Sequence, residues 1–355
     1  MTYPRLCIDT QKLLHNMRAA CALAHGQGVS VALVSKVTCA NDAVVACIEQ
    51  SGADMIADSR LLNLRAMHTS LPKLLLRIGM PQDAEAIVRD SDISLESELC
   101  TLQMLNDAAR AQNRVHQVIL MIDLGDLREG LFFRNRAAIL KTARFVCEAS
   151  HLALLGTGVN LTCYGSILPD TENLRCLVSL TEDLRRTLHA PIPLISGGNS
   201  SSFAMLQNGT LPKGINHLRL GESVMCGVVP GSYTPIAGFF QDVFTLETVL
   251  VELQQKPSVP IGVQSKNAFG ETVSYADQGE IVRGICAVGR QDVLLDGLTP
   301  CAPDVSILGA SSDHLILHMK NPQNYAVGDV LSFRLDYGAL LAASTSPYVQ
   351  KVTRP

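Results

Sequence analysis

Lys36 lies in the short apolar segment 31–37 and is the first residue whose chemistry could define a site. The segment is rich in β-branched residues, which predicts a strand buried on both faces. An ammonium in such an apolar place must be paired or must lose its charge. A desolvated amine is a nucleophile toward aldehydes, so one interpretation of Lys36 is a Schiff-base lysine. The other is a structural lysine that extends from the strand end to water.

A second candidate for chemistry is the segment Ser196-Gly-Gly-Asn-Ser-Ser-Ser202. Its two glycines let the backbone approach an anion, and Asn199 can cap the helix that follows, whose free N–H groups favour a phosphate. Ser200 and Ser201 add hydroxyl donors. The alternative is a glycine turn followed by a serine-rich helix cap. Together with Lys36, this phosphate cradle suggests an aldehyde cofactor that carries a phosphate, namely pyridoxal 5'-phosphate (PLP).

The elements that must position these residues form a repeating pattern between residues 31 and 219. Eight short apolar segments alternate with helical patterns, of which the clearest are Glu96–Gln112, Ala137–Glu148 and Thr171–Leu188. The candidate strands are Val31–Val37, Met55–Asp58, Leu74–Ile78, Ile93–Leu95, Val118–Asp123, Leu154–Asn160, Leu194–Ser196 and His217–Arg219. Eight such units predict an α/β fold, a (β/α)8 TIM barrel, with a doubly wound open sheet as the alternative. Barrel active sites form at the carboxyl ends of the strands, so polar residues there should lie together.

After about Gly231 the helical patterns stop and strand patterns take over. The segments Phe244–Leu253, Ile281–Val288, Val305–Leu308, His314–His318 and Val330–Leu335 are separated by glycine and proline. This pattern predicts an all-β C-terminal domain. Val229-Pro-Gly-Ser232 is a turn-forming stretch. We therefore predict a PLP-binding barrel over residues 1–231 and a β-rich domain over residues 232–355.

Composition excludes several other classes of protein. Hydrophobic residues make up 47% of the chain and charged residues 17%, so it is globular, and the net charge of -4 argues against nucleic acid or an anionic membrane as partner. We find no signal peptide and no apolar run that would span a bilayer. The 11 cysteines contain no CxxC pair, so we expect neither a disulfide framework nor a metal site, and a cytoplasmic location.

Several motifs in this order resemble one enzyme family. They are IDLGDLREG (122–130), GVNLTCYG (158–165), SGGNSSS (196–202), ILGASSDHLI (307–316) and SFRLDYGALLAASTS (332–346). The chain resembles the PLP-dependent amino acid racemases of the alanine racemase fold, which are fold type III PLP enzymes. Within them it is most similar to the ornithine racemases, with the related lysine racemases close by.

The resemblance implies a role for particular residues. Lys36 matches the lysine that binds PLP, and Arg219 matches an arginine that faces the pyridine nitrogen. The other implied contacts are a phosphate-binding serine at Ser200, backbone phosphate donors at Gly221 and Glu222, a phosphate-binding tyrosine at Tyr337, and an arginine near the substrate carboxylate at Arg128. Asn160 stands beside the ring, where alanine racemases carry a histidine.

Other positions depart from alanine racemase and bear on the substrate. Met121 replaces a lysine that is carbamylated in many of these enzymes, and Ala40 replaces a phosphate-binding tyrosine. The differences argue against alanine as the substrate. Asp313 is our candidate to bind the side-chain amine of a basic amino acid. Asp126 and Glu129 are the other carboxylates of the motif segments, and an exposed surface position is the alternative for each of the three.

Racemisation removes a proton from Cα and returns it on the other face, which two bases on opposite faces achieve without turning the substrate. The resemblance implies that Lys36 serves one face and that a tyrosine from the β-domain of a partner serves the other. Tyr275 is our candidate for that base, with an ordinary half-buried strand tyrosine as the alternative. We therefore predict a homodimer with shared active sites, and a metal-independent, two-base racemase of ornithine or lysine.

Three other functions stay open at this stage. They are an alanine racemase of broader specificity, a PLP-dependent decarboxylase of the same fold, and a PLP carrier protein without enzymatic activity. Decarboxylases of this fold place a glutamate where Arg219 stands, and a carrier protein would resemble the barrel alone.

Overall fold

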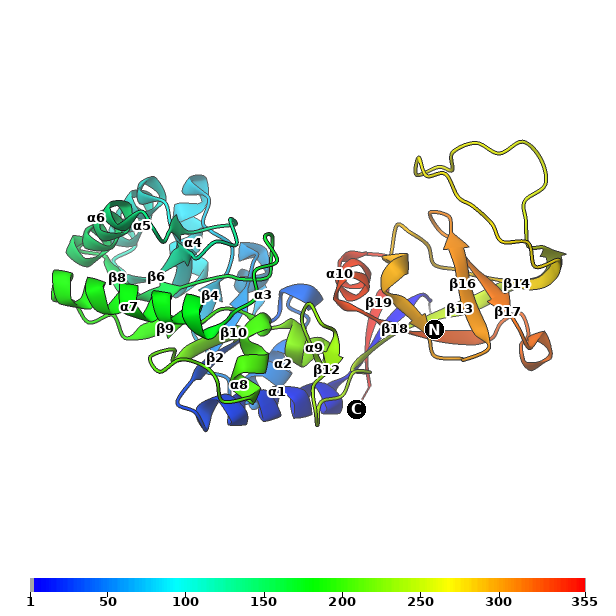
Figure 1. Ribbon diagram of the computed structural model, residues 1–355, viewed down its shortest axis with the longest axis horizontal. Coiled ribbons are helices and arrows are strands. Elements are labelled where there is room, and N and C mark those ends of the chain that lie inside the picture. The colour runs from blue at the N-terminus through cyan, green and yellow to red at the C-terminus, as the bar shows by residue number, and fades with distance from the viewer. Residues whose placement is uncertain (1–2, 355) are drawn as a thin grey trace. The chain divides into compact units, whose positions relative to one another are not determined.

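The computed structural model describes residues 3–354, which fold into two compact units (Figure 1). Residues 10–241 form the first, called the barrel unit here. The N-terminal residues up to Asp9 and residues 242 onward form the second, called the β unit. Among the described residues, none of the helices combines the length and the hydropathy that crossing a bilayer requires.

The barrel unit is built on eight parallel strands that close into a ring. They are β2 (Ser30–Val34), β3 (Met55–Asp58), β4 (Lys73–Leu75), β5 (Ile93–Glu96), β6 (His116–Asp123), β8 (Leu152–Gly158), β9 (Leu194–Ser196) and β10 (His217–Leu220). Their order is β5-β4-β3-β2-β10-β9-β8-β6, and pairing of β5 with β6 closes the barrel. The predicted (β/α)8 barrel is confirmed, and the open sheet is excluded because that sheet would leave two unpaired edges.

Helices follow the strands and cover the outside of the barrel (Figure 1). They are α1 (Thr10–His25), α2 (Asp42–Gln50), α3 (Leu61–Ala66), α4 (Ala84–Asp90), α5 (Leu99–Ala111), α6 (Arg136–Glu148), α7 (Thr171–Leu188), α8 (Phe203–Gln207) and α9 (Glu222–Cys226). Three short strands, β7 (Leu131–Phe132), β11 (Val228–Val229) and β12 (Thr234–Pro235), complete the unit. Helix α7 has the predicted bounds and begins with a capping box between Asp170 and Asn173.

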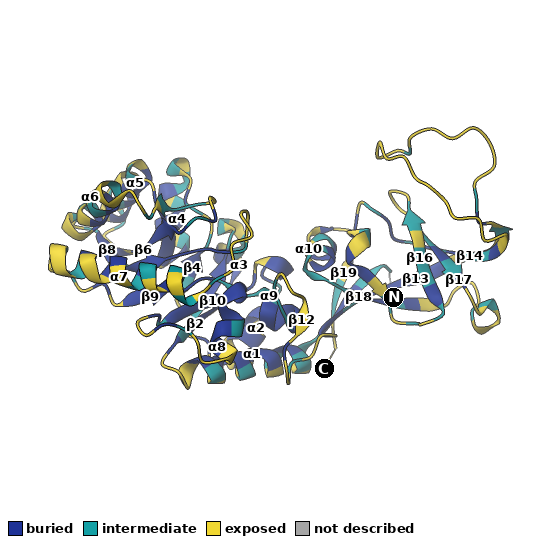
Figure 2. Cartoon of the chain, in the orientation of Figure 1, coloured by how far each residue is buried: buried dark blue, intermediate teal, exposed yellow. Residues whose placement is uncertain are grey.

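The interior of the barrel is filled by apolar side chains. The buried cluster consists of Ala32, Val34, Ala57, Leu74, Ile93, Leu95, Ile119, Met121 and Leu194. Figure 2 shows the strands buried, whereas the helices expose their outer faces. Because apolar side chains occupy the middle of the barrel, polar residues gather where the strands end.

The β unit contains an eight-stranded sheet in which most pairs are antiparallel. Its strands are β1 (Arg5–Asp9), β13 (Phe244–Pro257), β14 (Glu280–Cys286), β15 (Leu298–Pro300), β16 (Val305–Ala310), β17 (Leu315–Met319), β18 (Val330–Leu335) and β19 (Gln350–Arg354). The predicted β-rich domain is confirmed, with one addition: helix α10 (Tyr337–Thr345), whose cap Asp336 accepts a hydrogen bond from the Ala339 amide at 2.8 Å. Residues 258–279, yellow in Figure 1, form a long connection between β13 and β14.

The two units divide the chain at a different place from the predicted boundary at residue 231. Strand β1 belongs to the β unit because it pairs with both β13 and β19. Glu247 on β13 binds the Arg5 guanidinium at 2.6 Å and also pairs with Arg354, so one carboxylate joins all three strands. The turn-forming stretch around residue 231 connects β11 and β12 inside the barrel unit.

Candidate active site

Lys36 lies directly beyond the carboxyl end of β2, as the first residue of a 3-10 turn over Lys36–Thr38. The prediction placed it inside the strand; the strand ends at Val34, and Lys36 is exposed. The preceding residue, Ser35, is buried and donates a hydrogen bond to Oδ2 of Asp58 at 2.7 Å. Asp58 ends the neighbouring strand β3, so a buried side-chain contact between strands anchors the turn that carries Lys36.

Ser200 lies where the segments that follow β9 and β10 meet. Its hydroxyl oxygen accepts hydrogen bonds from the amides of Gly221 at 2.9 Å and Ser223 at 3.2 Å. Asn199 caps the 3-10 turn, as predicted: its Oδ1 accepts from the amide of Ser201 at 2.9 Å and from its hydroxyl at 2.7 Å. Amides and hydroxyls from two strand ends therefore converge on one place.

These donors suit a phosphoryl group. Amide and hydroxyl donors fit the oxygens of such a group, and a cradle of this kind needs a backbone that an anion can approach closely. Gly198 has φ of +113°, where a side chain would be strained. A Cβ on Gly221 would lie 3.1 Å from Cβ of Val34, so a side chain here would be tightly packed against the barrel strand.

Arg219 on β10 is buried at the same end of the barrel. Its Nη2 donates to the carbonyl of Val159 and to Oδ1 of Asn160, each at 2.7 Å, and its Nη1 donates to the hydroxyl of Ser196. Burial lowers the pKa of Arg219 to about 10, so the guanidinium remains a cation near neutral pH. A buried cation held on three acceptors is fixed in position and in charge.

Arg128 and Glu129 lie in the loop after β6 and form a two-bonded ion pair. Asn160, which follows β8, donates through Nδ2 to Oε1 of the same carboxylate. Burial would raise the pKa of Glu129, but the hydrogen bonds from Arg128 and Asn160 outweigh it and hold the pKa below its ordinary value. Glu129 is therefore a carboxylate that links Arg128 to Asn160.

Asp126 holds the loop that follows β8 and contains Asn160. Its buried carboxylate accepts hydrogen bonds from the backbone amides of Thr162, Cys163, Tyr164 and Ile167, at 3.0–3.2 Å. Burial raises its pKa, but the amide donors outweigh that effect and lower it. Both oxygens are therefore occupied by backbone, and Asp126 is a structural residue of the site.

The charged groups of these loops all influence the pKa of the Cys163 thiol. Burial raises its pKa, Arg128 and Lys36 act to lower it, and Glu129 acts to raise it. The carboxyl ends of β2, β6 and β8 thus bring their side chains to one region. The barrel unit gathers at its strand ends nine predicted site residues: Lys36, Arg128, Asn160, Asn199, Ser200, Ser201, Arg219, Gly221 and Glu222.

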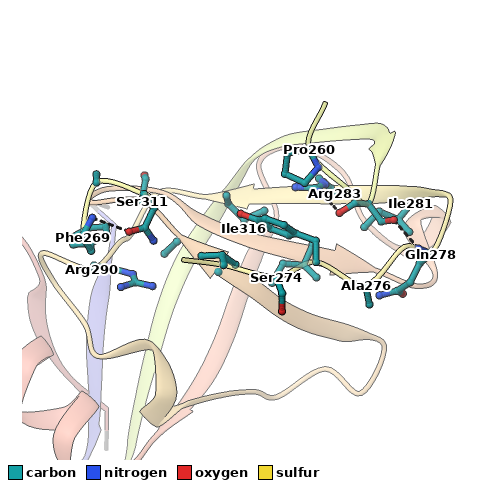
Figure 3. Close-up of a pocket in the computed structure, with 18 residues that line it drawn as sticks. Pro260, Phe269, Ser274, Ala276, Gln278, Ile281, Arg283, Arg290, Ser311 and Ile316 are labelled. Atoms are coloured by element: carbon teal, nitrogen blue, oxygen red, sulfur yellow. Dashed lines mark hydrogen bonds between the residues drawn. The ribbon is translucent and has the colours of Figure 1, made fainter. Parts of the chain in front are cut away.

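Tyr275 lies in the long connection of the β unit and is 44% exposed. It lines a cavity of about 440 Å³ together with Phe269, Arg290 and Ser311. In Figure 3 these last three side chains lie at one end of the cavity, with Arg283 at the other. Arg290 donates to Glu271 at 2.9 Å and lies 4.5 Å from the ring centroid of Phe269, which joins the connection to the segment after β14.

Asp313 and Tyr337 also belong to the β unit. Asp313 is exposed in the turn between β16 and β17 and accepts a hydrogen bond from the Ser311 hydroxyl at 3.2 Å. This bond and the neighbouring His314 hold the pKa of the carboxyl below its usual range. Tyr337 is the first residue of α10. The roles predicted for Tyr275, Asp313 and Tyr337 stay predictions. Within residues 3–354, no three His, Cys, Asp or Glu residues are grouped to hold a metal ion.

Comparison with known proteins agrees with this architecture. A family model described as "Alanine racemase, N-terminal domain" matches residues 8–228, which include all eight strands of the barrel. The chain belongs to the alanine racemase family. It is 42% identical to an ornithine racemase of Acetoanaerobium sticklandii over 98% of this chain and 99% of that protein. It is 34% identical to a lysine racemase of Thermotoga maritima over 100% of this chain and 99% of that protein.

Solved structures of alanine racemases share the fold. The alanine racemase from D-cycloserine-producing Streptomyces lavendulae superposes with a TM-score of 0.76 at 17% identity, over 100% of this chain and 98% of that one. The enzyme from E. faecalis gives 0.74 at 17% identity, over 99% and 98%. The predicted alanine-racemase fold of barrel plus β domain is therefore confirmed.

Three residues of this site have contacts that the sequence did not predict: Ser196 was not named as a site residue, and Glu129 and Asp126 were considered only as possible partners of a substrate amine. Ser196 holds Arg219, Glu129 holds Arg128, and Asp126 holds the loop after β8. The available signal was the motif Ile122–Gly130, in which two acidic residues and an arginine lie directly after a buried strand. The loop folds back closely on the end of β6 at Gly130, because a Cβ there would lie 2.6 Å from the amide nitrogen of Asp123.

Proposed function

We propose that this protein is a PLP-dependent racemase that interconverts the L- and D-enantiomers of ornithine, or of lysine. Support comes from two relatives aligned over nearly their full lengths, an ornithine racemase at 42% identity and a lysine racemase at 34%. The observation that carries the reaction type is Arg219, a buried cation held at the carboxyl end of the barrel close to the segments that bear Lys36 and Ser200.

The residues at the strand ends suit PLP. Lys36 would hold it covalently, and Ser200 and Ser201 with the backbone amides near Gly221 would hold its phosphate. Arg219 would face the ring nitrogen, beside Asn160. When bound, the cofactor would delocalise the negative charge that develops at Cα as its proton leaves. We also propose that Asn199 supports the phosphate site as the cap of the turn, that Glu222 contributes its backbone amide, and that Tyr337 reaches the phosphate.

Proton transfer at Cα is proposed to use two bases, one on each face. Lys36 is proposed to remove or return the proton on one face, and the phenol of Tyr275 on the opposite face. We propose that Tyr275 comes from a second copy of the chain, which makes the active form a homodimer with shared active sites. Arg128 would bind the substrate carboxylate, as a guanidinium binds carboxylates in a two-bonded fork. Asp313 is the proposed partner of the side-chain amine.

Arg219 favours racemisation over decarboxylation. A guanidinium only donates hydrogen bonds, so it leaves a facing pyridine nitrogen unprotonated. An unprotonated ring would withdraw electrons only weakly, which would favour return of the proton to Cα over cleavage of other bonds. An acid in place of Arg219 would favour the opposite outcome. Within the described residues no two cysteines form a disulfide, which supports the further proposal that the protein works in the reducing cytoplasm.

One assay separates this proposal from its alternatives. Purified protein with added PLP is incubated with L-ornithine, L-lysine or L-alanine, and the products are separated by chiral chromatography. We expect D-ornithine or D-lysine, and no product with Lys36→Ala. D-Alanine as the fastest product would favour an alanine racemase of broad specificity. Release of carbon dioxide and a diamine would favour a decarboxylase, and PLP binding without any product would favour a carrier protein.

A further inference from the structure

Glu129 connects the two arginines of the candidate site. One side of its carboxylate accepts from Nε and Nη2 of Arg128, and Oε1 also accepts from Nδ2 of Asn160. The Oδ1 of the same amide accepts from Nη2 of Arg219 at 2.7 Å. The chain of hydrogen bonds therefore runs from Arg128 through Glu129 and Asn160 to Arg219. The amide of Asn160 has a single orientation, because its oxygen must face the guanidinium and its nitrogen the carboxylate.

Both oxygens of Glu129 are occupied by these donors, and its side chain is only 16% exposed. A carboxylate in this state is poorly placed to bind the amine of a substrate as well. Its position instead determines how the guanidinium of Arg128 points. Arg128 is 39% exposed, whereas Arg219 is buried. Arg128 is therefore the more accessible of the two arginines to a substrate carboxylate that arrives from solvent.

The pairing uses one edge of the Arg128 guanidinium. Glu129 takes the edge made by Nε and Nη2, and no described residue accepts a hydrogen bond from Nη1. A guanidinium has five N–H donors, so the outer end still offers donors for a second carboxylate. A guanidinium fixed beforehand in one direction binds such a carboxylate with a smaller loss of conformational freedom.

We propose that Glu129 is a positioning residue that orients Arg128 toward the carboxylate of the substrate. The inference rests on the proposed function, since it assumes an amino acid substrate bound through Arg128. Glu129 itself does not touch the substrate or the cofactor. Its effect is on the placement of the arginine, so it governs the part of binding that depends on the carboxylate.

The test compares the PLP-loaded wild type with Glu129→Gln. Glutamine keeps the shape of the side chain but replaces one acceptor oxygen by an NH2 group that faces a donor, and it removes the charge. We expect KM for ornithine to rise about tenfold and kcat to change less than about threefold. The inhibition constant of 1,4-diaminobutane, which is ornithine without its carboxylate, should change less than about twofold. PLP content and the cofactor absorbance should stay as in the wild type.

Two further variants make the result specific. Glu148→Gln removes an exposed carboxylate at the end of α6 and should leave all of these values unchanged. In an Arg128→Lys background, Glu129→Gln should change KM by less than about twofold, because the arginine on which Glu129 acts is then absent. Glu129→Asp, which keeps the charge on a shorter side chain, should fall between the wild type and Glu129→Gln.

Several results would overturn the inference. One is an unchanged KM in Glu129→Gln, and another is an additive effect in the Arg128→Lys background. Equal weakening of ornithine and 1,4-diaminobutane, or loss of PLP, would make Glu129 a purely structural residue. Failure of the proposed function is a separate outcome, because the wild type itself would then not turn over ornithine.

Discussion

Asp126→Asn should destabilise the barrel unit, because asparagine cannot satisfy the loop that this carboxylate holds. Oδ1 accepts from the amides of Thr162 and Ile167, both at 3.1 Å. Oδ2 accepts from the amides of Cys163 at 3.2 Å and Tyr164 at 3.0 Å. Asparagine has one acceptor oxygen and one NH2 group, so in either orientation two backbone donors face another donor.

The magnitude follows from those two lost bonds. A hydrogen bond to a charged acceptor contributes about 1.5–3 kcal/mol, and a buried unsatisfied donor costs about 1–3 kcal/mol. Residues 163–166 are exposed, so water can satisfy part of what the side chain no longer does. We therefore expect the free energy of unfolding to fall by about 2–3 kcal/mol, near the lower end of what two such bonds would contribute together. For a unit of this size, the loss lowers Tm by about 5–10 °C.

Asp123→Asn is the matched control, three residues earlier, where β6 ends and this loop begins. Oδ1 of Asp123 alone accepts both of its backbone hydrogen bonds, from Gly125 at 2.8 Å and from Leu127 at 3.1 Å. An asparagine with its oxygen at that position keeps both, so we expect a change in Tm of less than about 3 °C.

Thermal unfolding followed by circular dichroism gives both values, and hydrogen exchange of amides 162–164 and 167 reports the loop directly. The Asp126→Asn protein should exchange faster at those four amides. If the two variants unfold at the same temperature as the wild type, the reasoning about Asp126 is wrong.

Four further predictions concern the site and the conditions in which it works. Lys36→Ala should lose both the borohydride-reducible cofactor bond and turnover; near-normal racemisation with a reducible bond elsewhere would contradict the assignment. Arg219→Glu should bind PLP, racemise more slowly and show a new long-wavelength absorbance or a side product. Wild-type rates without a new band would contradict the proposal that Arg219 faces the ring nitrogen. Light scattering should find a dimer. When Lys36→Ala and Tyr275→Phe subunits are mixed, about a quarter of all active sites should combine an intact Lys36 with an intact Tyr275 and recover activity; full activity in a monomer would rule out shared sites. Burial lowers the pKa of His116 to about 4 and that of His217 to about 3. Unfolded histidines bind protons near pH 6.5, so Tm should be constant above that pH and fall as the pH drops toward 4, whereas a constant Tm over that range would argue against neutral buried imidazoles.

The sequence was sufficient to predict the elements of the barrel. Strands β3 and β9 and helix α7 have the bounds that apolar periodicity predicted, and the other strands differ by a few residues at their ends. Periodicity reports which residues are buried locally, and a repeated strand–helix pattern leaves the barrel and the doubly wound open sheet as the main arrangements. The pairing of β5 with β6 decides between them. The motifs after the strands also identified Lys36, Ser200 and Arg219 as candidates, because strand ends of this fold meet at one face.

Pairings between distant segments were not encoded locally. The sequence did not show that β1 pairs with β13 and β19, and so the predicted boundary gave residues 1–9 to the barrel. Helix α10 was missed as well: its sequence is apolar on all sides, so it lacks the one-sided pattern by which a surface helix is recognised.

Only the tertiary structure assigned partners to the charged residues of the site. From the sequence, Asp126 and Glu129 were equivalent carboxylates in one loop, each with the surface as an alternative. In the fold, Asp126 is buried under the amides of the loop after β8, and Glu129 is joined through Asn160 to Arg219, 90 residues later in the chain. The composition of a loop sets which groups are charged. Which donors reach them is decided by the register of the strands that bring the loops together, because a hydrogen bond weakens steeply once its donor and acceptor are more than about 3.5 Å apart.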